Sequence, residues 1–339
     1  MESDRHNFTD PLNLVASLIM IVVGVFGVGC NLAVVYIFIR APTERTSFNL
    51  ICVYRGFANT LILGWAFVGT FVPMALFGDT FFSPLYQTLV IGIANSAYAG
   101  IQWTGVLIAV NRFAAIFFPK LYFTMFSVKM TFVISTAIFA QRVYRITMQF
   151  IQFIPIECFM TFSITDLTWY PNMEEKCDED STEVINSSLL YLVIIIVLNL
   201  CTLVKLYHFY KNTMLEADRV QIKMRKNRIM FLQTLIQDSI QLVDMIFTYR
   251  LSLLSSERYW TFISGSLIWE IVHSSDGFIM IMFNERLTFL KRSLFSSSAH
   301  PSNQNSMMFV STIPSRAGPQ QLSFPKKKKR RIFPFTRDR

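Results

Sequence analysis

Seven long apolar stretches follow one another along this chain of 339 residues. Each contains the ~20 predominantly apolar residues that an α-helix needs to cross ~30 Å of hydrocarbon. Their approximate bounds are 13–39, 48–77, 86–117, 128–163, 187–209, 229–253 and 260–283. The pattern predicts an all-α membrane protein that folds as a bundle of seven transmembrane helices.

Composition leads to the same fold class. Hydrophobic residues make up 53% of the chain and charged residues 16%, a balance that would leave a soluble domain unable to hide its apolar surface. No secretory signal peptide is expected, because the polar N-terminus leads into an apolar run too long for a cleaved segment. We therefore expect an extracellular N-terminus at 1–11, a membrane domain at 12–295 and a disordered basic cytoplasmic tail at 296–339.

The basic residues predict the orientation. Of the 31 Lys and Arg, 24 fall on alternate connections and the C-terminal tail, three on the other connections and four inside spans. Lys and Arg near helix ends stay on the cytoplasmic side, so the N-terminus is expected outside and the C-terminus inside. The acidic segment 166–183 and two glycosylation sequons, at Asn7 and Asn186, fall on the predicted outer face.

Several function classes fit the sequence poorly. The net charge of +9 follows the topology rule, so no nucleic acid partner is expected. No two of the four His residues have the spacing of a zinc site, and no Ser or Cys nucleophile has a partnered base in sequence. We expect no metal, no cofactor and no enzymatic activity.

Two cysteines flank the acidic outer segment. Cys158 and Cys177 could meet an oxidising compartment and close a loop over 18 intervening residues. Two free thiols remain the alternative, since Cys158 lies at the end of the fourth stretch.

Polar residues gather in the last two stretches. Gln233, Gln237, Gln241, Asp244 and Thr248 recur at spacings of four, four, three and four, while Glu270, His273 and Asp276 recur every three residues. Each spacing predicts one helical face. The two faces are either interhelical hydrogen-bonding glue or a ligand-contact surface. Gln237, His273 and Asp276 fit both, whereas Asp244 and Glu270, nearer the outer end, favour a cavity lining.

The fourth stretch is too long for one span. At ~1.5 Å per residue its 36 residues would extend ~54 Å, and Arg142 and Arg145 interrupt it. We interpret residues 141–150 as an insertion; otherwise both cations must turn into the bundle or reach an interface.

The seventh stretch carries the most specific motif, IWEIVHSSDGFIMIMFNERL at 268–287. Gly29-Cys30-Asn31 in the first stretch, Asn111-Arg112-Phe113 ending the third and the glutamine-rich 231–237 of the sixth accompany it. With these motifs the chain resembles the nematode serpentine receptor class x family of chemosensory G-protein-coupled receptors over about residues 12–295.

The resemblance implies a plasma-membrane receptor, in a sensory neuron or its cilium, that couples a small-molecule or peptide ligand to a heterotrimeric G protein. Arg112, with Asn111, would be the coupling switch; the alternative is an arginine that reaches lipid headgroups. Asn59 stands where rhodopsin-like receptors have Asp. The expected central polar network is Asn31, Asn59, Gln237, His273 and Asp276. The ligand-pocket candidates are Asn95, Tyr98, Gln102, Asp244, Trp269 and Glu270.

The inner surface is expected to contact membrane lipids. Residues 284–295 have the apolar spacing of a short amphipathic helix, and the tail carries six consecutive cations at 326–331. Two rival functions remain at this point: a seven-helix ligand-gated ion channel of inverted topology, and a small transporter, for which no internal repeat is found.

Overall fold

The computed structural model describes residues 10–171, 177, 181–213 and 218–283, with backbone only for 181–187, 209–213 and 218–230. The described residues belong to one compact unit within residues 1–294. The sequon at Asn7, the expected amphipathic helix at 284–295 and the tail lie outside them, and Asn186 lies where side chains are not described.

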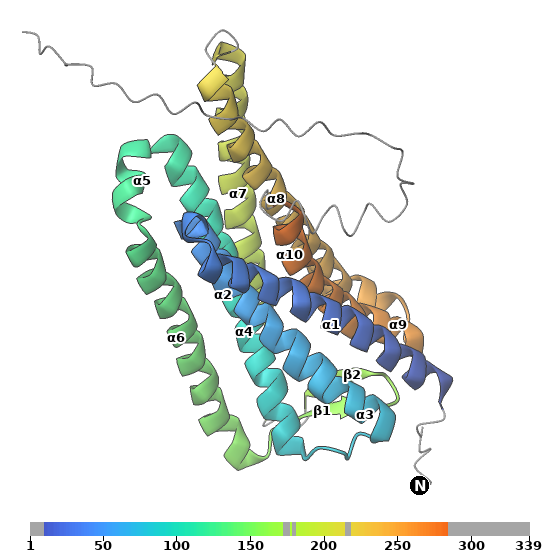
Figure 1. Ribbon diagram of the computed structural model, residues 1–339. Coiled ribbons are helices and arrows are strands. Elements are labelled where there is room, and N and C mark those ends of the chain that lie inside the picture. Colours follow the sequence, from blue (N-terminus) through green and yellow to red (C-terminus); the bar gives the residue numbers. More distant parts are fainter. Residues whose placement is uncertain (1–9, 172–176, 178–180, 214–217, 284–339) are drawn as a thin grey trace, which may run out of the picture. The chain divides into compact units, whose positions relative to one another are not determined.

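Seven helical spans run through the described part of this unit (Figure 1). The second and seventh each contain a π-helical segment, η2 and η6. The spans are α1 (Pro11–Arg40), α2–η2–α3 (Ser47–Leu61, Ile62–Phe71, Val72–Phe77), α4 (Pro84–Phe117), α6 (Val128–Phe153), α7 (Ser181–Thr213), α8 (Asp218–Tyr249) and α9–η6–α10 (Arg258–Phe262, Ile263–Leu267, Ile268–Phe283). The shorter helices are η1 (Pro42–Glu44), α5 (Pro119–Met125), η3 (Ile154–Ile156) and η5 (Leu251–Leu254).

Capping residues in the sequence set where several spans begin. Asp10, Thr46, Ser83 and Ser127 each precede a span, and each side chain accepts a hydrogen bond from a backbone N–H of the first turn. Such caps satisfy donors that a helix start leaves unpaired. The seven-helix prediction is confirmed, and the helix boundaries follow local chemistry.

The structure corrects the prediction for the fourth stretch. Helix α6 is continuous through 141–150 but ends at Phe153, and η3 follows it. Its 26 residues rise ~39 Å, enough for a single bilayer crossing. The excess length that suggested an insertion lies beyond the helix, in a turn with Glu157 at a positive φ of 58° and in a strand.

The two cations of α6 take different positions. Arg142 turns toward the bundle, where its Nη2 donates to the Tyr191 hydroxyl of α7 at 3.4 Å. Its carbonyl accepts a hydrogen bond from Ser96 of α4 at 3.1 Å. Arg145 is exposed on the outer surface of α6.

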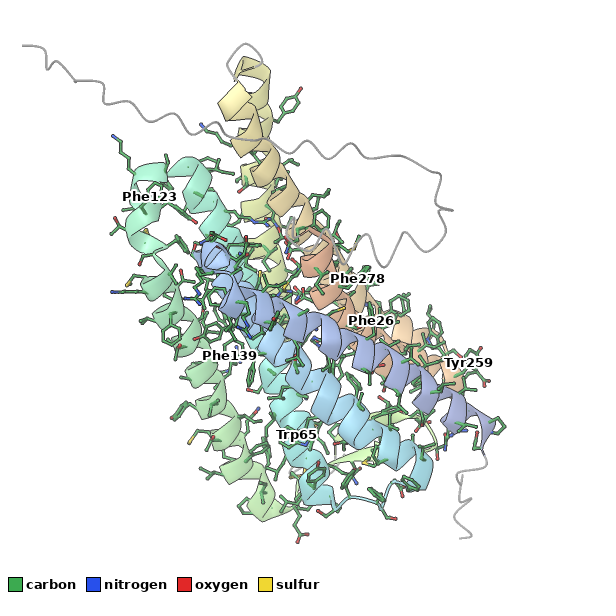
Figure 2. The ribbon with its side chains drawn as sticks, viewed as in Figure 1. Phe26, Trp65, Phe123, Phe139, Tyr259 and Phe278 are labelled. Atoms are coloured by element: carbon green, nitrogen blue, oxygen red, sulfur yellow. A yellow bond between two sulfur atoms is a disulfide. The ribbon has the colours of Figure 1, made fainter. Side chains whose placement is uncertain are left out.

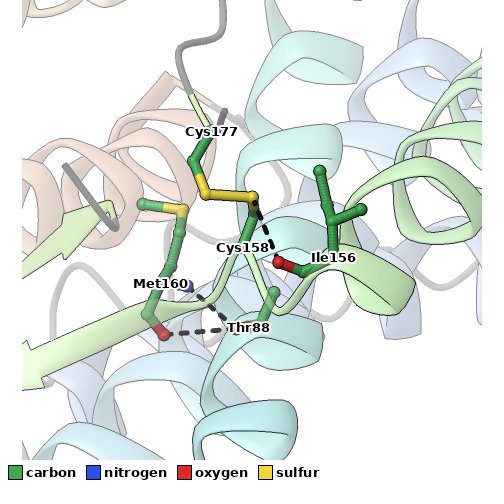
Figure 3. The surroundings of a disulfide bond; sticks show 5 residues. All are labelled: Thr88, Ile156, Cys158, Met160 and Cys177. Atoms are coloured by element: carbon green, nitrogen blue, oxygen red, sulfur yellow. Dashed lines mark hydrogen bonds between the residues drawn. A yellow bond between two sulfur atoms is a disulfide. The ribbon is translucent and has the colours of Figure 1, made fainter. Parts of the chain in front are cut away.

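A two-stranded hairpin covers one end of the bundle, which we call the hairpin end. Strand β1 (Met160–Ser163) pairs antiparallel with β2 (Thr168–Pro171), with Phe162 opposite Trp169. A disulfide joins Cys158, just before β1, to Cys177 (Figure 3). Thr88 of α4 both donates to and accepts from the Met160 backbone, at 3.3 and 2.9 Å. The hairpin is thereby tied to α4 and packed into the core of the unit.

Arg258 closes the hairpin end. Its guanidinium pairs with Asp10 at 2.6 Å, donates to Asn13 and donates to the Ile164 carbonyl at 2.9 Å. These contacts join the beginnings of α1 and α9 to the hairpin. Burial acts to raise the pKa of Asp10, but the hydrogen bonds from Arg258 and Leu12 and the arginine charge outweigh it and lower that pKa.

The outer surface of the bundle is apolar. Large side chains such as Phe123 and Tyr259, labelled in Figure 2, are 77% and 53% exposed. Four described helices are long and apolar enough to cross a membrane, or five if the bent pair α5 and α6 counts as one span. The last two spans carry the polar faces noted above, which lower their hydropathy but lie largely inside the bundle.

Candidate functional site

A buried ion pair joins α2 to α10 in the middle of the bundle. Asp276 accepts hydrogen bonds from Nε and Nη2 of Arg55 at 3.1 and 2.8 Å. The two side chains are 2% and 7% exposed. Arg55 is a functional candidate that the sequence reasoning did not single out, although a lone cation inside an apolar stretch was the available signal.

Asn59 extends this pair to α1 and along α10. Its Nδ2 donates to Asp276 at 2.7 Å and to Oδ1 of Asn31 at 3.1 Å. Its Oδ1 lies 2.8 Å from Nδ1 of His273. Asn31 in turn donates to the His273 carbonyl at 3.2 Å. The structure thus brings these four residues, all singled out from the sequence, into one network.

Gln237 connects α8 to the same carboxylate. Its Nε2 lies 2.5 Å from Oδ1 of Asp276 and donates to it. Asp276 therefore receives four hydrogen bonds, three from α2 and one from α8. A carboxylate with this many charge-assisted donors is held firmly in one position.

A small cavity adjoins the network. Its volume of about 10 Å³ is what one water needs. Oε1 of Gln237 and Nε2 of His273 belong to its lining residues and have no hydrogen-bond partner. Because Nδ1 of His273 faces the Asn59 oxygen, Nδ1 is assigned the proton and Nε2 is an acceptor. The residues that line the cavity thus carry two acceptors without a hydrogen-bond partner.

Glycines let α1 approach α10 closely enough to form the network. A Cβ on Gly277 would lie 2.7 Å from Cγ of Asn31, and one on Gly27 would lie 2.6 Å from the Ser274 hydroxyl. Any larger residue would push the helices apart, because such contacts are shorter than van der Waals distances. The Asn31 side chain reaches His273 only because these positions are glycine.

The opposite end of the bundle, which we call the Arg112 end, holds the Asn-Arg-Phe motif. Nη1 of Arg112 donates to the Phe231 carbonyl of α8 at 3.4 Å, and its guanidinium lies 5.4 Å from the Phe48 ring centre. Asn111 donates to the Ser47 hydroxyl of α2 at 3.3 Å. The motif therefore contacts α2 and α8 from the end of α4.

Part of the predicted ligand-pocket set comes together nearer the hairpin end. The Tyr98 hydroxyl of α4 donates to Oδ2 of Asp244 of α8 at 2.8 Å. The Tyr98 ring stands edge-on to Trp269 and to His273, with centres 6.2 and 5.7 Å apart. On the same face of α4, Asn95 is exposed and Gln102 is buried.

Glu270 takes a different place from the one expected. It is fully buried, and a Cβ on Gly24 of α1 would lie 2.7 Å from its Oε1. Neither Glu270 nor Asp244 belongs to the lining of the central cavity. Glu270 faces α1 instead, and both of its oxygens lack a partner.

The described residues contain no group of three or more His, Cys, Asp or Glu side chains that could hold a metal ion.

Comparison with family models identifies the bundle. The model of the serpentine type 7TM GPCR chemoreceptor Srx family matches residues 21–284, a range that includes every residue of the central network. The chain belongs to this family. This Srx chain is therefore a multi-pass membrane protein and a chemoreceptor of the G-protein-coupled type. A comparison with curated proteins finds no significant match.

Proposed function

We propose that this Srx receptor binds an external small molecule or peptide near the hairpin end and activates a heterotrimeric G protein at the Arg112 end. In this proposal the N-terminus is outside, the basic tail meets anionic lipid inside, and the receptor acts in the plasma membrane, including that of a sensory cilium. No enzymatic step takes part.

The observation that carries the proposal is the bond from Gln237 to Asp276. It ties α8 to the α2–α10 ion pair in the middle of the bundle, while Phe231 ties the same helix to Arg112. A movement that carries both Phe231 and Gln237 away from the bundle breaks both contacts. The central network around Asp276 and the Arg112 end are thus joined through α8.

Ligand binding then acts as a population shift. A ligand that favours the arrangement with α8 displaced releases Arg112, which becomes available to the G protein. To change the ratio of the two states from 1:99 to 99:1, the ligand must bind the displaced state tighter by ~5.5 kcal/mol. A ligand with equal affinity for both states signals nothing.

The test is G-protein activation in cells that express the full chain, measured as cyclic nucleotide or calcium against an odorant panel. Arg112→Ala should abolish the response while surface expression is kept. Arg145→Ala, which removes an exposed cation of α6, is the matched control and should leave the ligand response unchanged. A ligand response undiminished by Arg112→Ala and by G-protein blockade would contradict the proposal.

Orientation has its own test. A glycan on Asn7, detected as a mass shift removed by an N-glycosidase, would place the N-terminus outside. The inverted channel topology requires an unmodified Asn7, and a transporter requires substrate uptake without a G-protein response.

A further inference from the structure

Asp244 is a buried acid whose charge no described neighbour balances. It is 3% exposed, its Oδ2 accepts from Tyr98, and its Oδ1 has no partner. Among the side chains that the structure describes, no Lys or Arg pairs with it. Asp276, by contrast, is balanced by Arg55. A carboxylate buried without a counter-charge is costly unless something else supplies one.

Side chains on the α4 face that carries Tyr98 become less exposed with distance from the hairpin end. Asn95, Tyr98 and Gln102 follow at spacings of three and four and share one face of α4. Along this face the residues pass from exposed Asn95 through partly buried Tyr98 to Gln102, which is 8% exposed. Trp269 packs edge-on against Tyr98 at the same level. Asp244 is thus hydrogen-bonded to one of two packed aromatic side chains, on a helix face of α4 that also carries an exposed polar residue.

We propose that this site binds the protonated amino group of a small organic amine, with Oδ1 of Asp244 as its counter-charge and the Tyr98 and Trp269 rings as walls. The inference rests on the proposed receptor function and names the ligand class of its pocket. An ammonium group offers up to three N–H donors and a positive charge, which suit a free carboxylate oxygen and aromatic faces. A neutral alcohol of the same shape supplies no charge, and a carboxylic acid adds repulsion.

Glu270 is not an equivalent anchor. Its carboxylate lies against Gly24, where even one added methyl carbon would stand 2.7 Å from Oε1. Its carboxylate thus faces α1, whereas Asp244 accepts a hydrogen bond from Tyr98, which packs against Trp269. Asp244 is therefore the acid that lies beside the aromatic residues of the predicted pocket.

The experiment measures binding without any G protein. The purified full-length receptor in detergent micelles is heated with butylamine, benzylamine or 2-phenylethylamine, or with the alcohol of the same skeleton. At least one amine should raise the unfolding midpoint in a concentration-dependent manner, since ligands stabilise the state they bind, and its alcohol should not. Asp244→Asn should lower the affinity of the receptor for that amine about 10- to 100-fold, the range expected for a lost charged hydrogen bond.

Two further variants make the result specific. Asp244→Glu keeps the charge and should retain amine binding better than Asp244→Asn. Asp79→Asn removes an exposed acid at the hairpin end and should change nothing. Equal shifts by amine and alcohol, no shift by any amine, or an amine shift unchanged in Asp244→Asn would each overturn the inference.

The two proposals fail in different ways. Amine binding without G-protein activation would overturn the receptor mechanism and leave the amine site in place. Activation by a neutral odorant that Asp244→Asn does not affect would overturn the amine site and leave the receptor function.

Discussion

Replacing Arg55 by Leu should be among the most damaging changes in the bundle core. The substitution removes two of the four hydrogen bonds to Asp276 and its only ion-pair partner among the described residues. Both side chains are almost fully buried, so bulk water does not replace the lost donors. Breaking one partner of such a pair costs about 3–5 kcal/mol, far above the ~0.6 kcal/mol of an average interhelical hydrogen bond in a membrane.

The assay is the free energy of unfolding in mixed micelles, with a denaturing detergent as titrant and tryptophan fluorescence as the signal. Arg145→Leu is the control, because it removes an exposed arginine of α6 and should cost nothing. The double variant Arg55→Leu with Asp276→Asn removes both charges and keeps one acceptor oxygen. It should recover at least about 2 kcal/mol of the loss, because an unpaired buried charge is the main cost.

Two results would refute this reasoning. A loss of unfolding free energy below about 1 kcal/mol for Arg55→Leu would make the pair no stronger than an ordinary interhelical hydrogen bond. If the loss in the double variant equals the sum of the losses in the two single variants, Arg55 and Asp276 do not interact energetically, since coupled residues depart from additivity.

Three shorter predictions follow from other parts of the bundle. Gly277→Ala should destabilise the receptor by about 1–3 kcal/mol in the same unfolding assay, since its Cβ would lie 2.7 Å from an α1 side chain; Gly29→Ala, with nothing within 4 Å, should be neutral or stabilising. Gln237→Leu should raise ligand-free G-protein activity several-fold in cells, because it frees α8; unchanged basal activity would oppose the coupling role. The pKa of Asp10 is lowered from 3.8, so its pairing with Arg258 stabilises the fold above pH 3.8. This stabilisation is lost as the pH falls through the lowered pKa. The thermal unfolding midpoint of Asp10→Asn should therefore lack this part of the acid sensitivity that the unsubstituted receptor shows.

The sequence predicts the spans well because each depends on local information. An apolar run of sufficient length must be helical in a bilayer, and capping residues such as Thr46 and Ser83 mark the helix starts. The prediction that the fourth span continues beyond Phe153 was wrong for a physical reason. Residues 154–163 are apolar enough to resemble helix continuation, but they pack as a turn and strand against α4.

The ion pair in the central network could not be predicted, because its two residues are far apart in the sequence. Arg55 and Asp276 are 221 residues apart, and nothing in either neighbourhood names the other. An arginine in an apolar stretch can equally point out of the bundle toward headgroups, and Arg145 of α6 is exposed where Arg55 is buried. Only the packing of α2 beside α10 decides between these outcomes.

Residue spacing explains where the structure places the polar residues of the last two spans. A helix turns about 100° per residue, so three residues fall about 60° short of a full turn whereas seven come within about 20° of two turns. Gln237 and Asp244, seven apart, therefore share a face of α8, and one meets Asp276 while the other meets Tyr98. Glu270 and Asp276 are two steps of three apart, so they diverge by about 120° around α10. That divergence turns Glu270 toward α1 and leaves Asp276 for Arg55, although both belong to one run of regularly spaced polar residues.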